Sequence, residues 1–300
     1  MTIGDHCEEF AGKPVVDFHG DMDLTDPKNT AYALRLEYGE GSMVNLIETF
    51  LSKPGADQVE ALVIGLWEEA FDQSSQPIVQ ALVQHKDKLP NLKALFLGDI
   101  IYEECEISWI VQSDVSALFA AYPGLELFRV RGGNFLSLGD MSHGNLKELI
   151  VEAGGLGADV IQQVGKSRLP SLERLELWLG TEDYGGTSSV DDLTPILSGR
   201  LFPRLSHLGL CNAEHADAIA HAVASAPVTS KIQTLDLSMG TMGDEGADAL
   251  QSLSALANIN LSDNYISDDG LKGLRQQGLN VTSYSQGDPN EEWRYCTVSE

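Results

Sequence analysis

Positive charge is scarce in this sequence, which has 19 lysines and arginines against 45 aspartates and glutamates and a formal net charge of −26 at pH 7. Proteins that bind nucleic acid displace counterions with a basic surface, so this balance argues against nucleic-acid binding. The same charge would steer a basic partner toward the chain, although solubility alone also accounts for an acidic surface.

Cysteines are also few, and apolar runs are short. The four cysteines lie far apart with no C-x-x-C pair, which favours free thiols in a reducing compartment over a disulfide or metal role. The apolar runs end well before the roughly 20 residues that a membrane span requires. The amino-terminal residues have no basic region followed by an apolar run, so no secretory signal is predicted. We therefore expect a cytoplasmic protein without a membrane segment.

Motifs for catalysis and nucleotide binding are missing. There is no G-x-x-x-x-G-K-[ST] phrase, and the pattern G-x-G-x-x-G that Gly155 and Gly157 would begin fails at Val160. His215 and His221 are six residues apart, which does not place them on one helix face. We predict no catalytic residue and no cofactor, and expect that the protein is not an enzyme.

A short phrase, L-x-x-L-x-L, is present instead and recurs along the chain; one copy is Leu172-Glu173-Arg174-Leu175-Glu176-Leu177. Leu175 and Leu177 are two apart, so they lie on one face of a strand. One repeat cannot bury its leucines alone, and stacked repeats bury them in a continuous core. The middle apolar positions are Leu34, Leu62, Leu95, Phe128, Leu149, Leu175, Leu208, Leu235 and Ile259.

The final two units repeat most clearly. The stretch that begins at Leu235 matches the one at Ile259, and the acidic turn at Asp244 matches the one at Asp268. The expected fold is an α/β solenoid with a parallel sheet on the concave side and helices on the convex side. We predict a cap over residues 1–30, a solenoid of about nine repeats over 31–285 and a tail or cap, with a short strand, over 286–300. Return helices are expected over 43–51, around 78–82, and over 114–121, 191–197 and 217–224, with no full helix between 132 and 146.

The outward strand positions of the central repeats would form one concave patch, because adjacent strands lie roughly 5 Å apart. An exposed Trp178 beside Arg174 would suit a protein interface. In the alternative, the charges pair with one another and Trp178 is covered by the loop at Glu182. The positions are Arg129, Arg131, Glu148, Ile150, Glu152, Arg174, Glu176, Trp178 and His207.

Two long loops interrupt the repeats, at 98–110 and 180–186. A rigid scaffold presents its function on loops, so both are candidates for recognition. For the first loop, the alternative is that Ile107, Trp109 and Ile110 pack on the solenoid and the acids are solvated. The candidate binding residues of the loops are Tyr102, Glu104, Trp109, Asp183 and Tyr184.

A metal site is the other functional class that the residues permit. Asp17, His19, Asp21 and Asp23 alternate, so on an extended segment they would line one face and could hold a divalent ion. In the alternative, these residues belong to an exposed cap with solvated charges. An enzymatic or metal-dependent module that uses the acidic loops is the alternative to a binding protein.

From about residue 30 to 280 the chain resembles the leucine-rich-repeat superfamily, and its last two units resemble the ribonuclease-inhibitor-like subclass. The phrases at 102–110, 129–133 and 176–186 resemble a bacterial family of cytoplasmic leucine-rich-repeat proteins. The resemblance implies protein binding and no particular activity. The repeat's usual asparagine is absent from most units, with Asn212 and Asn264 the nearest candidates. We therefore expect a non-catalytic protein-interaction scaffold for a protein partner, with no cofactor or metal.

Overall fold

The computed structural model describes residues 3–37, 39, 41–253 and 256–299, and within them twelve strands form one open sheet in chain order. All neighbouring strands are parallel except the first two, as stacking of one strand per repeat requires. The strands are β1 (Glu9–Phe10), β2 (Lys13–Asp17), β3 (Ala31–Leu34), β4 (Ala61–Ile64), β5 (Ala94–Leu97), β6 (Leu127–Arg131), β7 (Glu148–Glu152), β8 (Arg174–Gly180), β9 (His207–Ala213), β10 (Thr234–Asp236), β11 (Asn258–Asn260) and β12 (Val281–Thr282).

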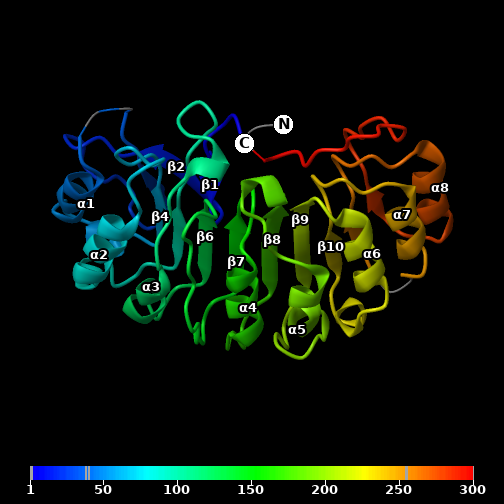
Figure 1. The fold of residues 1–300 in the computed structure, drawn as a ribbon. Helices are drawn as coiled ribbons and strands as arrows, with labels where there is room; N and C mark the ends of the chain where they lie inside the picture. The colour runs from blue at the N-terminus through cyan, green and yellow to red at the C-terminus, as the bar shows by residue number, and fades with distance from the viewer. Residues whose placement is uncertain (1–2, 38, 40, 254–255, 300) are drawn as a thin grey trace.

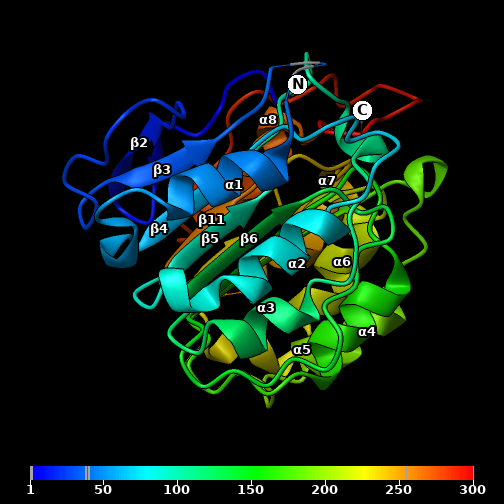
Figure 2. The same ribbon diagram turned by 90° about the vertical axis from the view of Figure 1, so that its left-hand side faces the viewer.

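The return segments form an outer layer of helices around the curved sheet (Figures 1 and 2), so the predicted solenoid is confirmed. The helix α1 has the predicted bounds, and Pro77 lies in the first turn of α2. The return over 132–147, all of it described, contains no helix, as predicted. The helices are α1 (Met43–Leu51), α2 (Gln76–Gln84), α3 (Ser116–Ala121), α4 (Ala158–Lys166), α5 (Thr194–Leu197), α6 (Ala216–Ala224), α7 (Asp244–Leu250) and α8 (Asp268–Gln276).

The main core is a ladder of apolar side chains between the sheet and the helices. The predicted middle positions from Leu62 to Ile259 are in register across β4–β11, and all are buried. The first repeat differs, because Tyr32 and not Leu34 pairs with Leu62. Tyr32 and Leu34 are two apart and share one face, so spacing alone could not separate them. Burial of each such side chain contributes about 1.5–3 kcal/mol.

A second, smaller core lies on the concave side of the first repeats. There Phe10 packs against Phe96, with ring centroids 6.0 Å apart. The neighbouring concave positions of β3–β5 carry small side chains such as Ala33 and Ala61, which leave room for the ring. The amino-terminal segment therefore covers the concave face of these repeats.

The carboxyl-terminal segment returns along the sheet after β12 (Figure 1). The side chain of Asn212 bonds the backbone of Val298 twice, accepting from its nitrogen at 2.9 Å and donating to its oxygen. The nitrogen of Thr297 donates to the oxygen of Met239 at 2.9 Å. The prediction of a short strand in this tail is wrong, because the described residues 283–299 contain no strand. They are held by side-chain and isolated backbone hydrogen bonds. In the described part of the chain, no helix is long and apolar enough to cross a membrane.

Candidate functional site

The concave face brings the predicted patch together on neighbouring register rows of β6–β9. Arg129 pairs with Ile150, which pairs with Glu176 on the next strand. The exposed fraction of the patch residues is smaller than the sequence suggested: Arg131 is 3 % exposed, Glu152 1 % and Trp178 9 %. The prediction of an exposed Trp178 is wrong, and the alternative in which the charges pair with one another fits the contacts described below.

Glu152 is the acceptor that ties the two arginines of β6 together. Its Oε1 accepts from Arg129 Nε at 2.7 Å and its Oε2 from Arg131 Nε at 2.8 Å. Both guanidinium groups lie near the Phe96 ring, at 4.3 and 5.2 Å from its centroid. Burial raises the pKa of Glu152, but Arg129 and Arg131 outweigh burial and hold it below the usual range. Glu152 and Arg131 are buried, Arg129 is partly buried, and the three side chains form one network of paired charges.

The next pair of strands repeats this arrangement around Glu176. Its carboxylate accepts from Trp178 Nε1 at 2.9 Å and from Arg174 Nη2 at 2.6 Å. His207 Nε2 lies 4.0 Å from the same carboxylate, and burial followed by the nearby Arg174 lowers the His207 pKa. Trp178 can be buried because its indole N–H donates to Glu176 on the same strand. Arg174, Glu148 and His207 keep part of their surface open on this half of the concave face.

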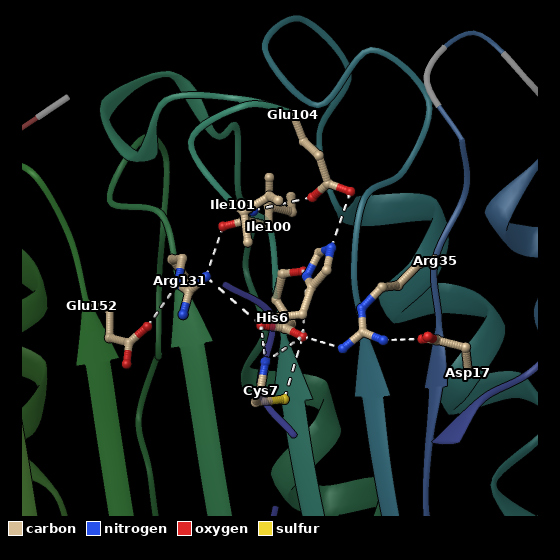
Figure 3. Close-up of polar contacts among 10 residues, drawn as sticks. His6, Cys7, Asp17, Arg35, Ile100, Ile101, Glu104, Arg131 and Glu152 are labelled. Carbon is tan, nitrogen blue, oxygen red and sulfur yellow. Dashed lines mark hydrogen bonds and ion pairs between the residues drawn. The ribbon is translucent and has the colours of Figure 1, made fainter. Parts of the chain in front are cut away.

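Sequence analysis missed a third cluster, which is centred on Asp99. Figure 3 labels its partners His6, Arg35 and Arg131. The buried carboxylate of Asp99 accepts from Arg35 Nη2 at 2.5 Å and lies 3.5 Å from His6 Nδ1 and 3.8 Å from Arg131 Nη1. Arg35 also pairs with Asp17. Burial raises the Asp99 pKa, but the His6 and Arg35 hydrogen bonds outweigh it, and the pKa lies well below its usual range.

A sequence signal for Asp99 did exist. Asp99 follows Leu97 by two residues, as Asn212 follows Leu210, so both occupy the inward polar position of the repeat turn. Asn212 uses this position to bind the tail, and Asp99 uses it to bind the amino-terminal segment. Their partners, Val298 and His6, lie too far away in the sequence for spacing to reveal them.

The Asp99 cluster has the wrong protonation states for general-base or thiolate chemistry. Hydrogen bonds to Asp99 and Glu104 raise the pKa of His6 to about 9, so its ring is protonated at neutral pH and cannot accept a proton. Burial and then the charge of Asp99 raise the pKa of Cys7 to about 12, so its thiol is neutral and a poor nucleophile.

The stretch from Asp17 to Asp23, which could have held a metal, does not form a ligand cluster. Among the described residues, no group of three or more histidine, cysteine, aspartate or glutamate side chains is placed to hold a metal ion. Asp17 at the end of β2 turns to Arg35, and the chain bends after it, with Met22 N donating to His19 O at 2.9 Å. The alternation of Asp17 to Asp23 does not lie on an extended segment, so the four side chains do not share one face.

We name the loop edge the five segments that follow β4–β8, namely 65–72, 98–110, 132–136, 153–157 and 180–186. Parallel strands end at the same edge of a sheet, so these segments are neighbours. They contain nine aspartates and glutamates and no lysine or arginine. The predicted loop residues Tyr102, Glu104, Trp109, Asp183 and Tyr184 all belong to this edge.

Two aromatic side chains stand out from the loop edge. Trp109 is 56 % exposed, so the alternative in which it packs into the solenoid is wrong, while Ile107 and Ile110 are buried. Phe135 is 82 % exposed and has a φ of 56°, a conformation that is strained for a bulky side chain. Asn134 Nδ2 donates to Ser108 O at 2.5 Å, so the two aromatics lie on neighbouring loops. Sequence analysis missed Phe135.

A hollow of about 170 Å³ adjoins these loops. Its walls include Glu68, Glu69, Phe71 and Glu104, so it is both acidic and aromatic. At about 30 Å³ for each water, it has room for a handful of waters or one long side chain.

The fold and the repeat ladder define the class of protein, a leucine-rich-repeat solenoid. The chain is similar to a Bacteroides fragilis protein whose crystal structure comes from a structural genomics consortium, with 32 % identity over 85 % of this chain and 73 % of that one and a TM-score of 0.78. The chain belongs to the same family of leucine-rich-repeat proteins.

Two other solved structures share less with it. An internalin, InlF of Listeria monocytogenes, has 15 % identity, coverage of 87 % of this chain and 68 % of that one and a TM-score of 0.43. The TLR13 chain of a TLR13–ssRNA13 complex has 12 % identity, coverage of 91 % and 35 % and a TM-score of 0.40. No protein-family model and no curated protein matches the chain.

Proposed function

We propose that the chain is a non-catalytic cytoplasmic scaffold that binds a protein partner through its loop edge and the open part of its concave face. The single observation that carries this proposal is the exposure of Trp109 and Phe135 on neighbouring loops of a rigid frame. Large aromatic side chains gain little by facing water, and interfaces use them as anchors.

The backbone of Phe135 adds support. A bulky residue in the left-handed region costs on the order of 1–3 kcal/mol, and an 82 % exposed ring recovers little of that cost by burial. A partner that covers the ring would supply the missing burial. The half-open side chains of Arg174, Glu148 and His207 would extend the contact onto the concave face.

The residues of the predicted patch divide into two groups under this proposal. The loop residues Tyr102, Trp109, Asp183 and Tyr184 would touch the partner. The buried Arg131, Glu152, Glu176 and Trp178 would hold the concave surface in shape, because their polar groups already have partners.

The test is affinity capture of the tagged full chain from native cytoplasm, followed by reconstitution of the captured protein with purified components. Trp109→Ala/Phe135→Ala should abolish a stoichiometric complex that the unmodified chain forms. Tyr284→Ala is the matched control, because Tyr284 is equally exposed but follows β12 at the far end of the sheet. Reconstitution that is unchanged in the double variant would rule out the loop edge as the binding surface.

A further inference from the structure

Among the residues that the structure describes, the loop edge carries carboxylates that have no cationic partner. Of its nine acidic residues, Asp99 and Glu104 are paired with Arg35 and His6, and the other seven make no ion pair within the described residues. The lysines and arginines where the strands begin, in contrast, pair with glutamates beside them. Lys93, Lys147 and Arg174, for example, lie at or just before the first residues of β5, β7 and β8. The seven unpaired carboxylates give the loop edge a negative potential that attracts cationic groups.

The aromatic side chains lie within this negative field. Trp109 follows Glu103 and Glu106 in one loop, and Phe71 shares the acidic hollow with Glu68 and Glu104. Aromatic faces attract guanidinium and ammonium groups, most strongly when carboxylates lie close by. The protein uses this pairing internally, where two guanidinium groups pack on the Phe96 ring.

We propose that the loop edge binds an arginine-rich segment of a partner protein, with guanidinium groups on Trp109 and Phe135 and one arginine side chain in the acidic hollow. This inference rests on the proposed function, because it names the partner of the same surface. Arginine suits the site better than lysine, because its planar group both stacks on a ring and forks onto a carboxylate.

The probe is a labelled 15-residue peptide in which arginine alternates with glycine and serine, titrated into the full chain and followed by fluorescence anisotropy. Its counterpart carries citrulline, which has the same shape without the charge, in place of each arginine. We expect the citrulline peptide to bind at least tenfold more weakly, and the affinity of the arginine peptide to fall as salt rises.

Variants then distinguish binding at the loop edge from attraction by the net charge of the whole chain. Trp109→Ala/Phe135→Ala and Glu69→Gln/Glu103→Gln should each weaken the arginine peptide several-fold, since Glu69 and Glu103 are exposed on the loop edge. The control Asp87→Asn/Glu173→Gln removes two exposed acids from the opposite edge. Its net charge therefore equals that of Glu69→Gln/Glu103→Gln. Equal weakening in the control and in Glu69→Gln/Glu103→Gln would mean that the net charge of −26 alone attracts the peptide, which overturns the inference.

Two further outcomes also overturn it. If neither peptide binds while reconstitution of the captured partner still depends on Trp109 and Phe135, the partner class is wrong and the proposed function stands. If sedimentation velocity finds a dimer of this chain that the aromatic double variant loses, the occupant is a second copy.

Discussion

His6 and Asp99 are 93 positions apart in the sequence, and His6 Nδ1 lies 3.5 Å from Asp99 Oδ2 at the loop edge. His6 Nε2 is also 3.4 Å from Glu104 Oε1, so the ring bridges two carboxylates. This contact holds the amino-terminal segment over the first repeats and makes part of the stability depend on pH.

Stability should fall as pH rises through about 9. The folded pKa of His6, about 9, exceeds the ordinary value of 6.5, so its contribution is complete below 6.5 and is lost as the folded ring deprotonates. His6→Gln should remove this part of the pH dependence. Urea unfolding at pH 6.5 and pH 9.5 measures it, with His19→Gln at an exposed position as the control. If the free energy of unfolding changes equally with pH in the unmodified chain and in His6→Gln, the pH dependence does not come from His6.

Removal of the negative charge shared by Arg129 and Arg131 should be costly. Glu152→Gln leaves Arg129 without its counter-charge and Arg131 with only Asp99, 3.8 Å away, and such a broken buried pair costs about 3–5 kcal/mol. The free energy of unfolding in urea is the measurement. Lys147→Gln, which breaks the exposed pair with Glu126, serves as the control and should change little. Equal losses in the two variants would contradict the buried network.

The thiol of Cys7 should be unreactive while the amino-terminal segment is bound. Burial and Asp99 raise its pKa to about 12, so the thiolate is scarce at pH 8. We expect the labelling rate of Cys7 with a thiol reagent, read by mass spectrometry of its peptide, to rise in His6→Gln. The buried Cys211, which is distant in the sheet, provides the internal control and should keep its rate. A Cys7 that reacts at the rate of a free thiol in the unmodified chain would show that the segment is not held.

The tail should detach when its buried anchor becomes charged. Val298→Asp places a carboxylate next to Asn212 in a site that is nearly closed to water, which unpaired charges do not tolerate. Hydrogen exchange of the 288–299 peptides should accelerate at least tenfold. Val16→Asp introduces the same charge at an exposed strand position and should leave those peptides protected. Unchanged protection in Val298→Asp would mean that other contacts hold the tail.

Some of the site was readable from the sequence because it depends on local periodicity. The L-x-x-L-x-L spacing places Arg129, Ile150 and Glu176 on one concave row whatever the rest of the chain does. The loops were found because they lengthen the repeats and carry acids. The exposure of Phe135 was not readable, because it depends on a backbone conformation that its neighbours impose.

The repeat follows from local periodicity, since alternation of apolar residues decides which face of each strand is buried and stacking follows from that face. Which concave and edge residues stay exposed depends on contacts between distant parts of the chain. Charges such as Arg131 and Glu152 satisfy each other across strands, and the two ends of the chain fold back onto Asp99 and Asn212. Those pairings depend on distances in space between residues far apart in the sequence, which no local pattern encodes.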